Sequence, residues 1–500
     1  MKRDNTSAEP GMQRAASSPG PWILGPWKDL VLFIGTPLLI IPLVAIAQLR
    51  FSAEAIGLVG VMGARGHHLP GMLRAYGDRE LFQRYRVRFI VAPVFLLIVC
   101  AMFATRVPDT LLVVLLLWGL WHGLAQVYGF MRIYDGKLGA RSTWRARLDM
   151  AMCIAWFVGG LLHSPDKVAD VLSQFYVVGG PVISSAMVDA FRGTWDVLTA
   201  LVTAGFLVYT VDRWRHGEPC SKLKLLVMAT SFSFWWYAMV YLKEIILGVA
   251  VFEIFHDVQY LAIVWVYNRT RVDKGRPVGA FTQFLFRPRT MLIALYVGLV
   301  VAYGCLSELS RVLDGWGVRS TMYTLIMAST FLHYYFDGFI WKIREQSTSE
   351  GLGMQGEKGT RLRTPPWFVH GLKWGAFVLP AAWLLLYPIY RPIDLLEWQR
   401  AVAYSVPDCA RAQETLGSSL ILANDLKQAQ VHCERAIRLK PNFAVAHNDL
   451  GTILARQQQY HDAAEHFAEA VRLKPDYKLA SDNFRTAKAM IEHERSSARP

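Results

Sequence analysis

Residues 251–267 read VFEIFHDVQYLAIVWVY, an apolar run that contains one histidine and two carboxylates. Extended back to residue 245, the run is long enough to cross a bilayer, since a membrane-spanning helix needs about 20 apolar residues. Ionisable side chains are costly inside a bilayer, so Glu253, His256 and Asp257 mark a functional site by default. This stretch therefore predicts both the fold class, a bundle of membrane-spanning helices, and the place of its chemistry.

Two further apolar runs carry a histidine near their centres. Residues 115–130, LLLWGLWHGLAQVYGF, contain His122. Residues 327–342, MASTFLHYYFDGFIWK, contain His333 with Asp337 four positions later. A histidine and a carboxylate four residues apart lie on one face of a helix, so they can bind one metal ion together.

The composition is that of a polytopic membrane protein. Of its 500 residues, 53% are hydrophobic and 13% are aromatic, which exceeds the usage of ordinary soluble domains. The net charge of +14 does not indicate nucleic-acid binding, because the chain beyond residue 390 is nearly neutral. The excess of Lys and Arg lies in short loops between apolar runs, which is the positive-inside pattern of membrane proteins.

We predict an all-α polytopic bundle in residues 28–390, preceded by a disordered polar N-terminus in residues 1–27. The polar start has no compact apolar region with a cleavage site, so we expect no cleaved signal peptide. The bundle is predicted to have about eleven membrane segments, at residues 28–48, 53–70, 89–106, 110–130, 147–163, 193–211, 223–241, 245–267, 289–306, 319–341 and 368–389.

The second predicted segment differs from the others because it is short and rich in glycine and proline. It ends in GARGHHLPG at residues 63–71, which predicts a broken or re-entrant helix, tolerated only where its backbone faces protein or a cavity. The pair His67 and His68 in this motif adds a fourth, shallower position to the three histidine-bearing runs. The alternative is that one of the pair binds lipid headgroups.

Every even-numbered segment is followed by a loop rich in Lys and Arg, whereas the other loops are poor in them. The rule that positive loops stay inside places the N-terminus in the cytoplasm. Eleven crossings then place the chain after residue 390 in the periplasm, so we predict a bacterial inner-membrane protein. His122, His256 and His333 all lie on even segments, which run in one direction, and their depths agree within about two helical turns.

These depths favour one metal site with His122, His256 and His333 as ligands, Asp257 or Asp337 as a ligand or orienting carboxylate, and His67 and His68 as further candidates. Such a set suits iron without haem, with manganese or zinc as weaker choices. A redox metal at this depth predicts an oxidoreductase acting on a lipid-like or other hydrophobic small molecule. Residues expected to support the ligands from outside are Gln126, Glu253 and Tyr260.

Two other interpretations of the histidines remain open. They can be interhelical hydrogen-bonding groups of a non-enzymatic, membrane-anchored assembly or scaffold protein. Alternatively, two of them can hold a haem for electron transfer.

The histidines and aspartate inside apolar runs, without motifs of soluble enzymes, resemble the Brp/Blh-type carotene dioxygenases. That family is a polytopic bundle in which histidines are proposed to hold iron, so the resemblance implies iron binding at His122, His256 and His333. The membrane fatty-acid desaturases are a poorer match because their paired histidine clusters are absent, apart from the adjacent His67 and His68.

The chain after residue 390 contains a repeat of 34 residues. Leu416-Gly417 and Pro441 recur as Leu450-Gly451 and Pro475, and this period with small residues at the helix contacts is typical of tetratricopeptide repeats. Residues 406–490 resemble that family, which implies paired helices and a groove for a peptide or protein partner. We place a repeat domain at 391–500, with repeats at 410–443 and 444–477 and a capping helix at 478–494.

Two repeats and a cap are fewer than the three repeats usually needed for stability. We therefore expect the repeats to be stabilised by packing against residues 391–405, the membrane bundle or a second copy of the chain. The six cysteines are scattered, without a CxxC pair. Cys409 and Cys433 would face an oxidising compartment if the tail is periplasmic, where a disulfide between them is one alternative to two free thiols.

Overall fold

The computed structural model describes residues 20–106, 111–140, 142–177, 179–242, 245–306, 315–341 and 394–497, and isolated residues at 308, 348, 352, 371, 375, 379 and 382–383. This part of the chain is helical, apart from one isolated bridge between Asp78 and Val278. The predicted all-α fold is confirmed for it. Residues 1–19 and nearly all of the predicted segment 368–389 lie outside the described residues.

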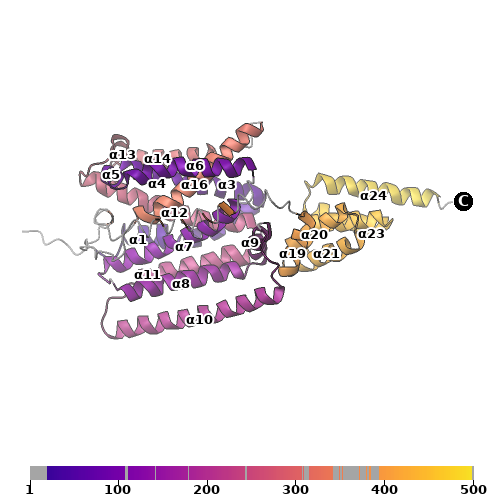
Figure 1. Cartoon of the computed structure of the whole chain (residues 1–500), viewed down its shortest axis with the longest axis horizontal. Coiled ribbons are helices and arrows are strands. Elements are labelled where there is room, and N and C mark those ends of the chain that lie inside the picture. The colour runs from indigo at the N-terminus through magenta and orange to yellow at the C-terminus, as the bar shows by residue number, and fades with distance from the viewer. Residues whose placement is uncertain are drawn as a thin grey trace, which may run out of the picture.

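A bundle of long helices forms the larger part of the molecule, and a smaller group of helices joins one end of it (Figure 1). The bundle consists of α1 (Pro26–Asp29), the π-helical turn η1 (Leu30–Ile34), α2 (Thr36–Gln48), α3 (Ala53–Gly66), α4 (His68–Gly77), α5 (Arg79–Arg84), α6 (Arg86–Arg106), α7 (Leu111–Lys137), α8 (Thr143–Leu162), α9 (Pro165–Val177), α10 (Ser185–Arg215), α11 (Lys222–Trp236), the π-helical turn η3 (Tyr237–Tyr241), α12 (Ile245–Asp273), α13 (Ala280–Leu285), α14 (Thr290–Leu306) and α16 (Trp316–Ile340).

Fewer helices than predicted meet the length and hydropathy of a membrane span. Four described helices do so, namely α6, α10, α12 and α11 continued by η3, and the number rises to six if each of two bent pairs counts as one span. The described residues therefore support four to six candidate spans rather than about eleven. One physical reason is local: segment 53–70 divides at His67 into two short helices, and segment 289–306 forms a helix of 17 residues.

The helix α10 exposes a long apolar surface, which suits a candidate membrane span. It has 31 residues with a mean hydropathy of 1.4 in its most apolar window, and only 6% of that window is buried in the protein. Large apolar side chains such as Leu201 and Val208 are 66% and 70% exposed. Water would disfavour so much exposed apolar surface, whereas lipid would not.

The two ends of the bundle differ in character. The short helices α5 and α13 lie at one end, whereas α9 and the small helical group lie at the other (Figure 1). The first end holds a buried ion cluster, in which Nζ of Lys224 lies 3.0 Å from Asp135 and 3.1 Å from Asp149. Arg132 lies 2.8 Å from each of the same two carboxylates. These contacts connect α7, α8 and α11 at the end that carries the basic loops.

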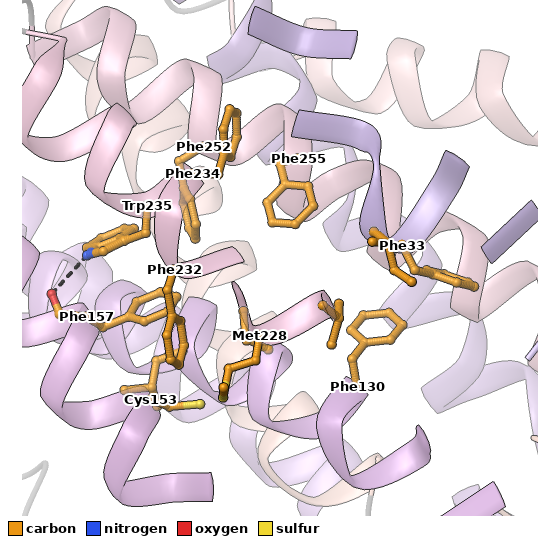
Figure 2. Packing of buried hydrophobic residues seen from close by; sticks show 14 of the residues in the cluster. Phe33, Phe130, Cys153, Phe157, Met228, Phe232, Phe234, Trp235, Phe252 and Phe255 are labelled. Carbon is orange, nitrogen blue, oxygen red and sulfur yellow. Dashed lines mark hydrogen bonds between the residues drawn. The ribbon is translucent and has the colours of Figure 1, made fainter. Parts of the chain in front are cut away.

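An aromatic core packs α8, α11 and α12 together. The rings of Phe157 and Trp235 stack with their centroids 4.6 Å apart, and Phe252 meets Trp235 edge-on at 4.7 Å. The indole N–H of Trp235 donates to the carbonyl of Phe157 at 2.9 Å, which is the dashed contact in Figure 2. Offset and edge-on aromatic pairs stabilise a core beyond their buried area. The contact of Phe252 with Trp235 therefore holds α12 in place one helical turn before His256.

The smaller group consists of α19 (Leu395–Ser405), α20 (Ala410–Leu422), α21 (Leu426–Leu439), α22 (Ala444–Arg456), α23 (Tyr460–Leu473) and α24 (Lys478–Ser497). Close approach within each helix pair depends on glycine. A Cβ added to Gly417 of α20 would lie 2.6 Å from Sγ of Cys433, and one added to Gly451 would lie 2.7 Å from the ring of Phe467. The 34-residue spacing of these glycines thus repeats one packing contact.

The repeat helices pack against α19, and α19 packs against α9. The hydroxyl groups of Tyr176 in α9 and Ser405 in α19 lie 2.7 Å apart, and the indole N–H of Trp398 donates to the carbonyl of Ser173 at 2.9 Å. Arg411 of α20 forms an ion pair with Asp170. The helix α9 is bent by 89° from α8, so it lies across the end of the bundle and offers a platform to the repeats.

Cys409 and Cys433 do not form a disulfide, because both thiols are free. Cys409 begins α20: its Sγ accepts from the amide of Ala412 and donates to Asp166 at 3.3 Å. Cys433 is buried against Gly417 inside the first helix pair. Each thiol therefore has its own packing role.

Candidate metal centre

Four histidines from separate parts of the bundle converge on one point. His67 lies at the junction of α3 and α4, His122 on α7, His256 on α12 and His333 on α16. Their Nε2 atoms form a chain of close contacts, with 2.9 Å from His67 to His333, 3.1 Å from His333 to His122 and 3.1 Å from His122 to His256. One ligand atom from each lies within 4.8 Å of all the others.

The four imidazoles are buried, with at most 8% of any residue exposed. A neutral imidazole nitrogen carries either one proton or one lone pair. Nε2 of His333 and of His122 each lie in two contacts, so hydrogen bonds among the rings cannot satisfy all three contacts fully. A cation at the centre would accept a lone pair from every ring.

Glycine contacts bring His67 to the centre. The helix α3 packs on α12 where a Cβ on Gly60 would collide with Ala250, and on α14 where a Cβ on Gly304 would collide with the carbonyl of Met62. A side chain at Gly66 would lie 2.5 Å from the carbonyl of Val300. His67 then caps α3 with φ −69° and ψ −8°, and α4 begins at the next residue. The segment expected to be broken thus has its break at a histidine of the centre.

Asp257 lies on the outer side of His67. Its Oδ1 is 2.7 Å from Nδ1 of His67, whose Nε2 faces the other histidines. A carboxylate in this position holds the Nδ1 proton and leaves the Nε2 lone pair free for a metal. Gly63 leaves room for the carboxylate, since a Cβ there would lie 2.7 Å from Oδ2.

Asp337 lies beside the centre, with Oδ2 3.8 Å from Nε2 of His333. Its Oδ1 accepts hydrogen bonds from the hydroxyl of Tyr260 at 2.8 Å and from the indole N–H of Trp341 at 3.2 Å. Two donors to one oxygen fix the carboxylate and leave Oδ2 on the side of the histidines. Asp337 is therefore adjacent to the four nitrogens without belonging to the tight group.

The remaining predicted residues lie farther out. His68 is buried but has its Nδ1 3.1 Å from the hydroxyl of Ser329, and it is not one of the four converging residues. The amide N–H of Gln126 donates to the carbonyl of His256 at 3.0 Å and to Gln259 at 3.1 Å, so it fastens α7 to α12. Glu253 groups with Asp257 and His67 on the outer side of the centre.

Sequence reasoning did not identify three neighbours of the site. The ring of Tyr334 stacks on His122 with centroids 4.7 Å apart. Trp341 donates to Asp337, and Ser329 is shared by His68 and Tyr303. The i, i+4 spacing of Asp337 and Trp341 is the one signal in the sequence that could have found a member of this set.

A hollow in the tail opens between α19, α20 and α21, and reaches the start of α10. It is lined by two arginines, a histidine and a glutamine among other residues, namely Arg400, Arg435, His432 and Gln413. The amide of Gln413 donates to the carbonyl of Ala403 and its oxygen is 2.8 Å from Nδ1 of His432. Gln413 therefore connects α20 to α19 and α21 through polar contacts.

Comparisons with known proteins bear on the tail. The family model of the tetratricopeptide repeat matches residues 444–477, the range predicted for the second repeat. No curated protein matches the chain, so the resemblance of the bundle to the carotene dioxygenases rests on the histidines alone. The repeat match supports a protein-interaction role for the tail.

Proposed function

We propose that this chain is a membrane-embedded, metal-dependent oxidoreductase whose metal is held by Nε2 of His67, His122, His256 and His333. The observation that carries the proposal is the convergence of these four buried nitrogens. Imidazole is a ligand for iron, copper and zinc, and the absence of a nearby thiolate from this group separates it from structural zinc sites rich in cysteine.

The spacing of the nitrogens suits a single transition-metal ion. For metal–nitrogen bonds of about 2.1 Å, nitrogens on one ion are about 3.0 Å apart at right angles and about 3.4 Å apart in a tetrahedron. The three contacts of 2.9–3.1 Å lie close to this range. We propose iron, with manganese second, because the proposed reaction requires a redox metal.

The surroundings support an apolar substrate. Tyr334 stacks on His122, the ring of Trp118 lies 6.0 Å from that of Tyr334, and Phe331 stacks on Trp118 at 5.6 Å. The bound metal would supply the redox change. The protein's own residues hold it in a dry environment, and the carboxylates fix the orientation of His67 and stand beside His333. We propose a lipid-like molecule as the substrate.

The same spacing argues against haem. Two histidines that bind one haem iron lie on opposite faces of the ring, so their nitrogens are about 4 Å apart with a planar macrocycle between them. The four imidazoles are in direct contact with one another. A haem would have to separate them.

Metal analysis of the full chain purified in detergent tests the proposal. Wild-type protein is expected to hold iron in stoichiometric amount, and His122→Ala, His256→Ala or His333→Ala to lose it. His68→Ala is the matched control, because His68 is equally buried but points to Ser329. A folded wild-type protein that stays free of metal after reconstitution with Fe²⁺ would exclude the proposal.

For location, we propose the bacterial inner membrane with the N-terminus in the cytoplasm and the repeats in the periplasm. The support is that the basic loops and the repeats lie at opposite ends of the bundle (Figure 1), as the positive-inside rule requires for this orientation. Protease protection of the tail in spheroplasts and in inverted vesicles tests it. Cleavage of the tail in inverted vesicles alone would reverse the assignment.

A second candidate function is that of a non-enzymatic membrane-anchored scaffold, and the repeat match favours it. The repeats would then recruit a protein partner, as the enzyme's tail would also do. The two candidates differ at the histidines. A scaffold retains its partner when His122 and His333 are both replaced by Ala and the chain remains folded, and its wild-type form binds no metal.

A further inference from the structure

Two carboxylates stand next to the four histidines on the outer side of His67. Glu253 and Asp257 are four residues apart on α12, so they share a face of that helix. One ligand atom from each, with one from His67, forms a group whose members lie within 4.8 Å of one another. The same imidazole therefore belongs to two groups, one with histidines and one with carboxylates.

Oδ1 of Asp257 faces Nδ1 of His67 at 2.7 Å. The other oxygen, Oδ2, is buried without a hydrogen-bond partner among the residues that the structure describes. The Asp257 side chain is 8% exposed. A bound cation would give this buried oxygen the partner that it lacks.

One carboxylate is enough to hold the outer proton of a metal-bound imidazole. Asp257 satisfies that need at 2.7 Å. Glu253 then has no part in orienting His67, yet it lies in the same group.

We propose that His67 bridges two cation positions, and that Glu253 and Asp257 bind a second divalent cation on the Nδ1 side of its ring. This inference rests on the proposed function, because the first position is the four-histidine centre. Binding of both cations removes the remaining ring proton of His67, which leaves to solvent. Two carboxylate oxygens and one nitrogen favour a hard ion such as Mn²⁺, Mg²⁺ or a second Fe²⁺.

Titration of the metal-free full chain with Mn²⁺ in detergent tests the second position. Wild-type protein is expected to bind two Mn²⁺ per chain, and their electron paramagnetic resonance spectrum is expected to show spin coupling through the shared imidazole. Glu253→Gln and Asp257→Asn keep the shape of each side chain but remove its charge. Each is expected to bind one Mn²⁺ with an uncoupled spectrum. Asp196→Asn, which changes a half-exposed carboxylate on α10, is expected to behave as wild type.

The outcomes separate this inference from the proposed function. One Mn²⁺ in wild-type protein, unchanged by Glu253→Gln, overturns the second position and leaves the four-histidine centre standing. His122→Ala is expected to weaken the first position and to leave one Mn²⁺ on the carboxylate side. A folded wild-type chain that binds neither Mn²⁺ nor Fe²⁺ overturns both. Thermal unfolding followed by circular dichroism shows whether each variant has remained folded.

Discussion

The backbone of Gly71 lies directly against the hydroxyl group of Tyr260. A Cβ placed on Gly71 would come within 2.7 Å of that oxygen and within 3.2 Å of Nδ1 of His333. The same hydroxyl donates to Asp337, which stands beside the four-histidine centre. A missing methyl group on α4 thus leaves room for a hydrogen bond between α12 and α16.

The first prediction concerns this contact. Gly71→Ala is expected to push the Tyr260 hydroxyl away from Asp337 and to lower metal affinity by roughly 10- to 100-fold, as is usual when a residue that orients a metal site is changed. Gly338→Ala is the control, since Gly338 follows Asp337 on α16 and has open space around it. Metal competition with a chelator measures both. Equal affinity of the two variants would contradict the proposed role of the contact.

A second prediction concerns the packing of α3. Gly304→Ala on α14 places a methyl group against the backbone carbonyl of Met62, which cannot move without shifting α3. We expect a loss of stability of about 1–3 kcal/mol, typical of an overfilled contact. Gly298→Ala lies on the same helix with nothing within 4 Å and is expected to change little. Thermal unfolding in detergent compares them, and equal midpoints would show that α3 is free to adjust.

A third prediction tests the environment of α10. Leu201 lies near the middle of this helix with its side chain 66% exposed. Leu201→Arg is expected to reduce insertion into membranes, because Arg at the centre of a span costs about 3 kcal/mol. Met187→Arg, equally exposed but near the end of the helix, should insert almost normally because its charge can reach the interface. Carbonate extraction measures insertion, and full retention of Leu201→Arg would argue that α10 does not face lipid.

The repeats contain a carboxyl pair that predicts pH dependence. Burial, and next the charge of Asp449, raise the pKa of Glu414 from 4.5 to about 7. The hydroxyl of Ser418 contacts both carboxyl groups, and its single proton cannot be donated to both. The folded tail therefore keeps a proton on Glu414 that the unfolded chain releases. This stabilisation is complete below about pH 4.5 and is lost as the pH rises through 7.

The fourth prediction follows from that sign. Thermal unfolding of the full chain between pH 5 and 8 is expected to show a tail transition that falls as the pH rises, by about 1–3 kcal/mol in all. Glu414→Gln, which resembles the protonated form, is expected to flatten the fall. Glu465→Gln, at an exposed position, should retain it. A slope that Glu414→Gln leaves unchanged would assign the pH dependence to other groups.

The candidate centre was predictable from the sequence where an ionisable side chain interrupts an apolar run. His122, His256 and His333 each interrupt a hydrophobic run, and the structure brings all three together. His67 was separable from His68 only by knowing where α3 ends, because one residue along a helix turns a side chain by about 100°. That rotation places His67 in the centre, whereas His68 contacts Ser329 instead.

The number of spans was less predictable, because hydropathy measures composition and not the direction of a helix. The helix α9, at residues 165–177, follows α8 directly but is bent by 89° from it. The partner that holds this turn is α19, more than 200 residues later in the chain. No window of the sequence contains both sides of that contact. The helix pairs of the tail, by contrast, repeat a local pattern every 34 residues, and their positions follow from it.

The contact between α9 and the tail sets an order for biosynthesis. Asp166 and Cys409 meet although 243 residues separate them. A ribosome that adds about 5–20 residues per second reaches Cys409 roughly 10–50 s after Asp166 has been made. During that interval the apolar side chains Val168 and Leu172, buried in the finished protein, have no tail to cover them. A nascent chain that stalls before residue 395 would leave these side chains exposed to chaperones and proteases. Exposed apolar surface on α9 would therefore mark an incomplete chain for cellular quality control.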